Sequence, residues 1–314
     1  MGQLRDVPFA VGEPGRLAAE VRAGAPLGAS IGSDIELAEH AIRGVAVRAA
    51  SARGLSHRHR GTERQDAFVC CWDEDRGVLL VAVADGVGSK KRSREASTAA
   101  VRLAAEAWER GNTDLIGIVL EVNDHLMECI PRDERGYRVG ATTLTLAEVP
   151  VEDGRLGNAN VAWVGDTPVW TLSDGNWAEV TPQDDAADGF AAPISALPAR
   201  NLSVLNAVAP TPGGAIFVMT DGVGNAIRNS VEVRAALAGW WAAPPGIYTF
   251  GAQVEFARIS FVDDRTVVGI WAQSPGEPPL ESGERREPQP LVAEPESEDD
   301  PEAPDTGREG DDAE

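Results

Sequence analysis

Short β-type runs bounded by turn-forming residues are the feature that most constrains how this chain can fold. They are rich in Val, Ile, Leu and Ala, as strands buried in a protein core are. They do not alternate one for one with helical segments, which disfavours a doubly wound parallel sheet. The eight runs are Val45–Ala50, Ala67–Trp72, Val78–Ala84, Thr142–Ala147, Val161–Val164, Pro168–Leu172, Ala215–Met219 and Thr266–Trp271.

Helical periodicity is clearest in two neighbouring segments. Ser93–Arg110 repeats Ala and Leu at helical spacing and stops at Gly111. Thr113–Ile130 carries one apolar face and is followed by Pro131. A weaker pattern predicts a third helix over Val231–Trp241. Runs of strands with a pair of helices between them predict an α+β domain built of layers.

The charge divides the 314 residues into parts of different character. The whole chain has a net charge of −22, and residues 273–314 alone hold 15 acidic and 3 basic residues, which gives −12. That Pro-rich acidic segment is predicted to be a disordered tail. Residues 1–44 are Gly- and Ala-rich and are predicted to be a partly ordered extension. The folded domain is then expected at residues 45–272.

Several classes of protein are disfavoured by composition. A net charge of −22 argues against nucleic acid or an anionic membrane as the main partner. No run approaches the ~20 apolar residues that span a bilayer, and the N-terminus lacks the apolar core of a secretory signal. Three cysteines cannot form a disulfide framework. We therefore expect a cytoplasmic protein and a monomer.

Aspartates stand at the ends of four predicted strands. Two buried strands end in the same pattern of Asp, Gly, Val and Gly, beginning at Asp85 and at Asp221. Asp66 precedes a third strand, and the pair that begins with Asp263 precedes a fourth. One Asp-Gly dipeptide would indicate only a turn. Four strand-end carboxylates in one domain favour a site for hard divalent cations such as Mg²⁺ or Mn²⁺, which prefer oxygen ligands.

A pair of cations held by carboxylates can ionise a water and hold a phosphoryl oxygen for in-line attack. Such a site also needs a cation from the protein for the remaining phosphate oxygens. Arg58, Arg60 and Arg64 lie just before Asp66 and are the candidates to bind substrate. A solvated surface loop would explain Arg58 and Arg64 equally well.

Six short motifs run in order along the chain and together resemble the metal-dependent protein phosphatase family (PPM, type 2C), with details similar to its bacterial branch. Each motif is weak alone, whereas the ordered set is specific. The motifs are Arg64-Gln65-Asp66-Ala67, Val83-Ala84-Asp85-Gly86-Val87-Gly88, Gly140-Ala141-Thr142-Thr143, Val164-Gly165-Asp166-Thr167-Pro168, Met219-Thr220-Asp221-Gly222-Val223 and Asp263-Asp264-Arg265-Thr266.

The resemblance implies a four-layer α-β-β-α sandwich of two antiparallel sheets flanked by helix pairs, with two Mn²⁺ or Mg²⁺ ions at one end. It implies hydrolysis of phosphoserine and phosphothreonine in a protein that a Ser/Thr kinase phosphorylates. Asp66 and Asp85 would lie nearest the reacting water. A structural role at a strand turn is implied for Asp166. The implied metal ligands are the carboxylates of Asp66, Asp85, Asp221 and Asp263 and the carbonyl of Gly86.

The chain departs from the family pattern at three positions. Gly61 stands where relatives often carry the Arg that binds phosphate, so Arg60 is the expected substitute, with Arg58 and Arg64 behind it. Val87 replaces a His that is a candidate general acid, which leaves a water or His57 for that role. Tyr137 stands where a third-metal Asp is often found, with Asp133 nearby but out of register.

Two other interpretations compete with a metal-dependent phosphatase. Residues 85–90 combine glycines and a Lys before a helix, but their spacing fits neither a P-loop nor a dinucleotide-binding turn. A phosphatase-like fold without activity could serve as a binding or regulatory module. Loss of a metal Asp would indicate such a module, and all four are present.

Overall fold

The computed structural model describes residues 9–13, 15–16, 33–88, 90–181, 195–211 and 214–272. Its contacts divide the chain after Ser282, and all described residues belong to the first unit. The predicted tail at 273–314 and most of residues 1–32 lie outside the described residues. No described helix is long and apolar enough to cross a membrane.

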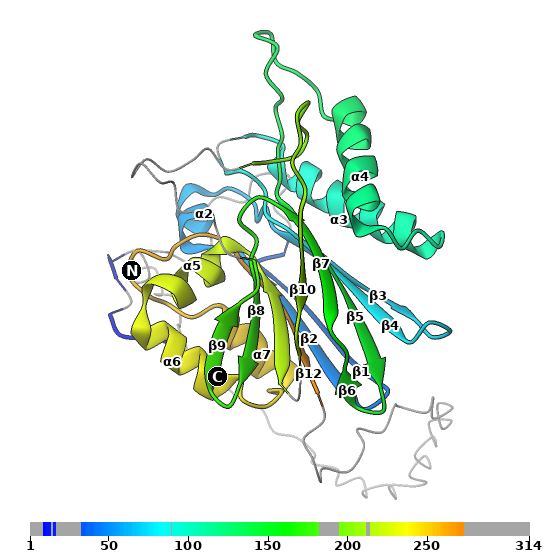
Figure 1. Ribbon diagram of the computed structural model, residues 1–314. Coiled ribbons are helices and arrows are strands. Elements are labelled where there is room, and N and C mark those ends of the chain that lie inside the picture. Colours follow the sequence, from blue (N-terminus) through cyan, green and yellow to red (C-terminus); the bar gives the residue numbers. More distant parts are fainter. Residues whose placement is uncertain are drawn as a thin grey trace, which may run out of the picture. The chain divides into compact units, whose positions relative to one another are not determined.

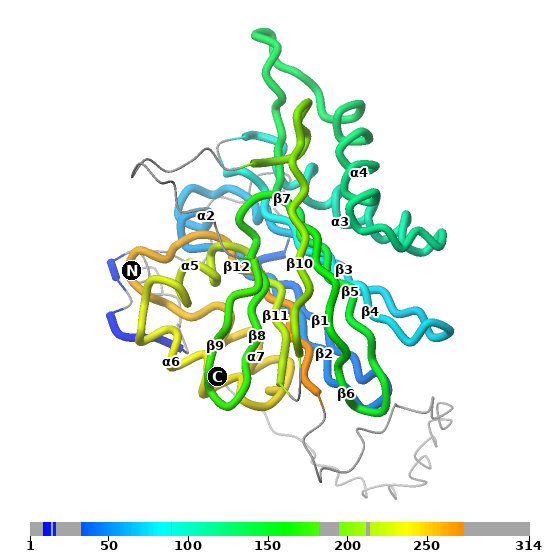
Figure 2. The backbone as a smooth tube through the Cα atoms, in the orientation of Figure 1, coloured from blue at the N-terminus to red at the C-terminus, as the bar shows by residue number. Residues whose placement is uncertain are grey.

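Two antiparallel sheets form the centre of the domain (Figures 1 and 2). The first sheet has the order β1-β2-β12-β11-β8-β9, and the second has the order β10-β7-β5-β4-β3 with β6 paired to β5. The strands of the first sheet are β1 (Ile35–Ile42), β2 (Val45–Ala52), β12 (Arg265–Trp271), β11 (Ala215–Met219), β8 (Val169–Ser173) and β9 (Asn176–Glu179). Those of the second are β10 (Leu205–Ala209), β7 (Ala159–Val164), β5 (Leu144–Glu152), β4 (Val78–Ala84), β3 (Ala67–Asp73) and β6 (Arg155–Leu156).

Helices cover the outer face of each sheet (Figure 1). α3 (Ser93–Glu109) and α4 (Leu115–Cys129) pack on the second sheet, where α3 contacts β3 and β4. α5 (Asp221–Asn229), α6 (Val231–Trp240) and α7 (Ile247–Val254) lie on the first sheet, and the short α2 (Leu55–Arg60) follows β2. The order of layers is therefore helices, sheet, sheet, helices.

Strand β4 shows why the layers form. Leu79, Val81 and Val83 point into the core between the two sheets, while Leu80 and Ala82 point into the core beneath the helices. Both sides of the strand are buried, so its sequence is a continuous apolar run rather than an alternating one. Such a strand is stable only in the middle of a layered domain.

The two helical layers are packed in different ways. α3 places alanines at helical spacing against the sheet, and its last turn buries Trp108, whose Nε1 donates to Glu148 Oε1 at 2.9 Å. The opposite layer is aromatic: Trp241 stacks on Phe217 at 5.4 Å between ring centroids, and Phe250 packs against Trp271 at 5.7 Å. Small residues thus let α3 pack closely on its sheet, whereas large aromatic rings fill the space between the other sheet and its helices.

The predicted fold class is confirmed, and strands occur at all eight predicted runs. The predicted helices correspond to α3, α4 and α6. The short strands β6, β9 and β10 and the helices α2, α5 and α7 were not predicted, because their segments are brief or begin inside a turn motif.

The predicted start of the folded domain at residue 45 is too late. β1 pairs with β2 along its whole length, from Ile35 opposite Ala52 to Ile42 opposite Val45. Val11 is also buried and its N–H donates to Ala257 O at 3.1 Å. The Gly and Ala content of residues 1–44 conceals this strand, whose side chains are mostly exposed or half-buried.

Removal of β1 is expected to destabilise the domain strongly, since it leaves one edge of β2 without its partner strand along the whole length of β2. A chain starting at Val45 should melt about 10 °C or more below one starting at Ser33, by circular dichroism. Equal melting temperatures would show that β1 is dispensable.

Candidate metal centre

The strand-end aspartates converge at one end of the sandwich. Asp85 follows β4 of one sheet, while Asp221 opens α5 directly after β11 of the other. Asp66 precedes β3, and Asp263 lies two residues before β12. β4 contacts both β11 and β12 across the sandwich. Carboxylates far apart in the sequence are therefore held together by the packing of the two sheets.

A cavity of about 480 Å³ opens where these strand ends meet. Three of the predicted ligands line it, Asp85, Asp221 and Asp263, together with Gly86. Asp166, for which a structural role was expected, also lines it. The cavity thus carries four carboxylates, and its lining contains a single cationic side chain, which the sequence interpretation did not select.

Asp66 lies behind this cavity and is 3% exposed. Its Oδ2 accepts hydrogen bonds from the hydroxyls of Thr220 and Thr266, both at 2.8 Å. Its other oxygen, Oδ1, is buried and has no hydrogen-bond partner. A buried carboxylate oxygen left without a partner is costly, so this atom is the strongest indication that the cluster is built to bind a cation.

The carboxylates repel one another in the absence of positive charge. Burial raises the pKa of Asp66 well above its usual value, and the charge of Asp264 adds to this. Burial likewise raises the pKa of Asp85, with further contributions from Asp66 and Asp221. The pKa of Asp221 is raised to about 6, mainly by burial and then by the charge of Asp166. A bound divalent cation would reverse the balance by stabilising the ionised forms.

Asp264 is next to the predicted ligand Asp263, and both of its carboxylate oxygens accept hydrogen bonds from backbone N–H groups. Its Oδ1 accepts from Gly54 N at 2.6 Å, and its Oδ2 accepts from Gln65 N at 2.6 Å. His57 Nδ1 lies 2.8 Å from Asp264 Oδ1. Asp264 therefore ties the loops after β2 and before β3 to the start of β12, and this holds Asp66 and Asp263 in place.

His57 is buried beside this carboxylate. Burial lowers the pKa of His57, but the hydrogen bond and charge of Asp264 and the charge of Asp263 outweigh it, so that the pKa is raised overall. Ligand atoms of His57, Asp263 and Asp264 lie within 4.8 Å of one another, close enough to share an ion. His57 thus enters the acidic cluster through space, although its spacing from His59 gave no metal pattern.

A second chain of contacts leads outward from Asp221. Asn225 Nδ2 donates to Asp221 Oδ2 at 3.1 Å, and Arg228 NH1 donates to Asn225 Oδ1 at 2.7 Å. Arg228 is in turn paired with Glu179. Asn225 lies one helical turn after Asp221, so α5 itself supplies the group that orients this carboxylate.

Two glycines allow the loops to approach closely. A Cβ on Gly222 would lie 1.9 Å from the carbonyl oxygen of Asp264, and one on Gly86 would lie 2.7 Å from that of Gln65. Neither distance is possible for a real side chain. The glycine after each strand-end Asp is therefore required where the Asp85 and Asp221 loops touch the segments holding Asp66 and Asp263.

Arg58 and Arg64, which were predicted to bind substrate, do not line the cavity, and their role in substrate binding stays a prediction. Arg58 is 8% exposed, and its Nε donates to Arg53 O at 2.8 Å while its NH2 pairs with Glu255 at 2.7 Å. Arg64 NH1 donates to Ser51 O at 2.8 Å, and its NH2 pairs with Glu36. Both guanidinium groups are already committed to holding neighbouring segments together.

Arg60 is exposed at the end of α2 and does not line the cavity, so its role as the phosphate clamp stays a prediction. Lys90 is the cation that does line the cavity. It is half-buried, and no ion pair of the described residues involves it. The sequence patterns did not select Lys90 as a substrate-binding residue, although it lies five residues after Asp85 in a short basic cluster with Lys91 and Arg92.

Asp133 has no place in the cavity. Its Oδ1 accepts from the backbone N–H groups of Arg135 and Tyr137, at 3.0 and 2.8 Å, within the loop between α4 and β5. It stabilises that loop and does not line the acidic cavity.

The model of the protein phosphatase 2C family matches residues 53–245. No curated protein sequence matches the chain significantly. Among solved structures, a bacterial serine phosphatase is similar with a TM-score of 0.55 and 14% identity, covering 73% of this chain and 98% of that one. A serine/threonine phosphatase of S. agalactiae is similar with a TM-score of 0.54 and 17% identity, covering 76% and 99%.

The family match covers more than half of the chain, so the chain belongs to the protein phosphatase 2C family. The structural similarities, at these low identities, establish the shared fold. The buried, unpartnered oxygen of Asp66 and the mutually repelling carboxylates fit the metal dependence of this family.

The metal-free protein is expected to lose stability from Asp221 as pH rises. Its pKa of about 6 in the folded state lies above the ~4 of an unfolded carboxyl group. The folded state therefore binds more protons, and stability falls between pH ~4 and ~6. Asp221→Asn removes this penalty, so the metal-free variant should exceed wild type by about 1–3 kcal/mol at pH 7.5 and match it at pH 4, in urea unfolding.

Asp75→Asn, in an exposed turn, is the matched control and should follow wild type at both pH values. If metal-free Asp221→Asn were less stable than wild type at pH 7.5, the carboxylate would be stabilising the fold and the repulsion described above would be absent.

Proposed function

We propose that this protein is a metal-dependent phosphatase that hydrolyses phosphoserine and phosphothreonine in proteins. The observation that carries the proposal is the cluster of strand-end carboxylates, with the buried Oδ1 of Asp66 unpartnered, beside a cavity that also holds Lys90. A purely structural acidic cluster would be neutralised by arginines, as Asp34 and Glu255 are by Arg58.

Two Mn²⁺ or Mg²⁺ ions bound there would supply an activated water and hold the phosphoryl oxygens. In the proposal Asp66, Asp85, Asp221 and Asp263 provide carboxylate oxygens and Gly86 provides its backbone carbonyl. Thr220 and Thr266 hold one oxygen of Asp66, which leaves the other free for an ion. Asp264 fixes the loops, and Asn225 orients Asp221.

Lys90 is proposed to bind the phosphate of the substrate. Arg58 and Arg64 are engaged elsewhere, and Gly61 provides no side chain. The ammonium group lines the same cavity as four carboxylates and so lies near the proposed ion site, where it can contact a dianionic phosphate. With Val87 at the position after Asp85-Gly86, water is the proposed proton donor to the leaving oxygen, because His57 is buried beside Asp264 and does not line the cavity.

The proposed substrate is a protein phosphorylated by a Ser/Thr kinase, whose action the phosphatase opposes, and the proposed form is a cytoplasmic monomer. An inactive, phosphatase-like binding module is the second candidate. The chain has all four carboxylates proposed as metal ligands, although an inactive module would not need them, and this favours the enzyme.

Asp85→Ala is expected to abolish metal-dependent turnover, because Asp85 lines the cavity and faces both Asp66 and Asp221. Hydrolysis of p-nitrophenyl phosphate with Mn²⁺ should fall by about 10³-fold or more. Asp75→Ala is the control and should behave as wild type. If wild type shows no turnover with Mn²⁺, Mg²⁺ or any other divalent ion, the result would contradict the proposed function and favour the binding module.

Lys90→Gln is expected to raise KM for a phosphopeptide about ten-fold and leave kcat within about two-fold, because Lys90 binds phosphate in both ground and transition states. Lys90→Arg should recover part of the loss. Arg60→Ala, tested in parallel, distinguishes the two candidates for binding phosphate. A rise in KM for Arg60→Ala and none for Lys90→Gln would show that Arg60 binds the phosphate instead of Lys90.

A further inference from the structure

Most described arginines of this acidic protein are neutralised by a carboxylate. Their ion pairs include exposed ones on helices and turns as well as buried ones. The paired arginines are Arg43, Arg48, Arg53, Arg58, Arg64, Arg76, Arg92, Arg94, Arg102, Arg110, Arg228 and Arg258.

Several cations that form no ion pair among the described residues lie near the loop between α4 and β5, and we call four of them, Lys91, Arg132, Arg138 and Arg200, the basic rim; Arg135 lies in the same loop. Arg132 and Arg138 lie opposite each other in an isolated antiparallel bridge. Burial lowers the pKa of Arg138, and the charges of Arg132 and Arg200 lower it further. Arg138 therefore lies near both Arg132 and Arg200.

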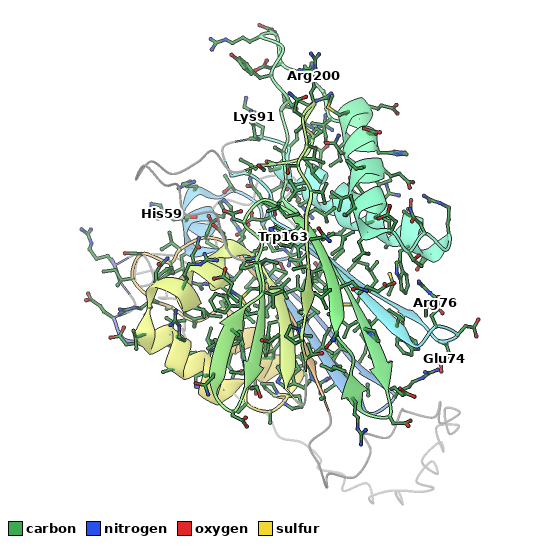
Figure 3. All side chains as sticks on the ribbon, viewed as in Figure 1. His59, Glu74, Arg76, Lys91, Trp163 and Arg200 are labelled. Carbon is green, nitrogen blue, oxygen red and sulfur yellow. The ribbon has the colours of Figure 1, made fainter. Side chains whose placement is uncertain are left out.

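Lys91 is joined to the rim through the backbone. Arg92 N donates to Val139 O at 3.0 Å, which places Lys91 beside the loop that holds Arg138. Figure 3 shows Lys91 and Arg200 at the same end of the domain, while Arg76 and Glu74 lie at the far β3–β4 turn. The loop itself projects beyond the sheets in Figure 1.

The rim borders the acidic cavity. Lys91 follows Lys90, and Arg138 lies three residues before Ala141, which lines the cavity. Thr142 and Leu197 exchange backbone hydrogen bonds at 2.9 and 2.7 Å, and this pairing brings the segment with Arg200 to the same edge. A chain entering the cavity with a phosphorylated residue would lay its neighbouring residues across the rim.

The rim has the composition of a protein-binding surface. Arg132, Lys91 and Arg200 are exposed, and Tyr137, in the same loop, is 66% exposed. Arg and Tyr are enriched where proteins bind one another. Asp133 and Glu134 lie in the same loop, so the positive charge is local, which suits a short acidic segment better than an extended polyanion.

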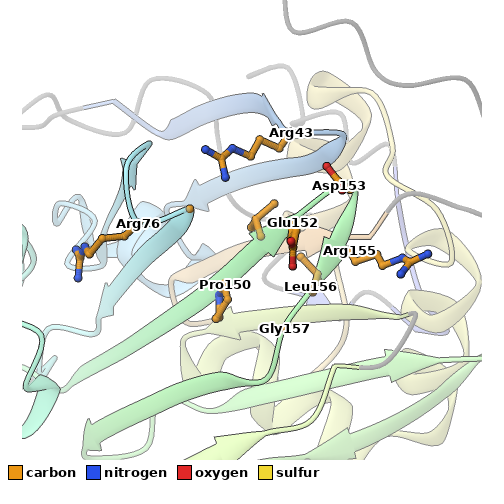
Figure 4. A pocket seen from close by; sticks show the side chains of 10 residues that line it. Arg43, Arg76, Pro150, Glu152, Asp153, Arg155, Leu156 and Gly157 are labelled. Carbon is orange, nitrogen blue, oxygen red and sulfur yellow. The ribbon is translucent and has the colours of Figure 1, made fainter.

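The cavity at the opposite end of the sandwich provides a contrast (Figure 4). It has a volume of about 670 Å³ and is lined by Arg43, Arg76 and Arg155. Arg43 is paired with Glu74 at 2.8 Å, and Arg76 with Asp73 at 2.7 Å. Two of its three cations are thus neutralised, whereas no described carboxylate neutralises the cations of the rim; Arg132 and Arg138 donate instead to the backbone oxygens of Gly136 and Ile130.

We infer that the basic rim selects phosphoprotein substrates that carry acidic residues or further phosphorylated residues beside the target residue. This inference rests on the proposed phosphatase function and adds a substrate class to it. Opposite charges at a surface increase the rate of encounter and fix the register of binding, so the preference is expected in kcat/KM and should weaken with salt.

The test uses the full chain and three phosphothreonine peptides that differ only in acidic, neutral or basic flanking residues. Wild type should prefer the acidic to the neutral peptide about ten-fold in kcat/KM at low salt. Lys91→Gln/Arg132→Gln/Arg200→Gln should reduce the preference to about two-fold or less. Arg102→Gln/Arg110→Gln/Arg155→Gln, with the same change in charge elsewhere, should keep it.

Because Arg132 NH1 donates to Gly136 O, a second variant leaves that loop intact. Lys91→Glu/Arg200→Glu should reverse the preference toward the basic peptide. Equal kcat/KM for all peptides in wild type, or an unchanged preference in both rim variants, would overturn the inference. Equally tight binding of a short DNA duplex would also overturn it by showing a general polyanion surface.

Hydrolysis of p-nitrophenyl phosphate separates this inference from the proposed function. All rim variants should retain wild-type turnover of this small substrate, which cannot reach the rim. If wild type hydrolyses nothing, the proposed function fails, and fluorescence anisotropy of the same peptides then decides the inference through binding alone. In that binding assay, equal affinity of wild type for the acidic and neutral peptides would contradict the inference.

Discussion

The carboxylate of Asp66 is the point on which both the fold and the site depend. Asp66 enters β3 of one sheet, and its Oδ2 accepts hydrogen bonds from Thr220 and Thr266, which belong to the ends of β11 and β12 in the other. Thr266 is fixed in turn by Ser51 at 2.6 Å. The same side chain therefore ties the two sheets together at one end and presents its second, unpartnered oxygen to the acidic cluster.

Charged side chains are arranged differently at the surface of the domain and around Asp66. Carboxylates near the surface are neutralised by arginines, whereas those at the strand ends are left to repel one another, which raises the pKa of Asp85 and Asp221. Such repulsion costs stability, and proteins keep it where an ion or substrate offsets it. The cations of the basic rim lie at the border of the same cavity, where a phosphorylated chain would need them.

Sequence patterns predicted the layers and the carboxylates well. The continuous apolar run of β4 and the repeated Asp-Gly pattern at 85 and 221 are local signals, and local signals are what a sequence carries. The roles of the arginines were not predictable. Arg58 and Arg64 meet Glu255 and Glu36 only after folding. Lys90 reaches the cavity because its loop turns back beside Ala141, and no spacing along the chain records that contact.

The strand-end carboxylates are proposed to form a two-ion centre, and the proposed chemistry depends on it. Equilibrium dialysis of the purified full chain against Mn²⁺ measures this directly by counting bound ions. We predict two ions per chain for wild type and a loss of at least one in Asp66→Asn, whose Oδ1 would no longer carry charge. Binding of no Mn²⁺, or an unchanged count in Asp66→Asn, would contradict the claim.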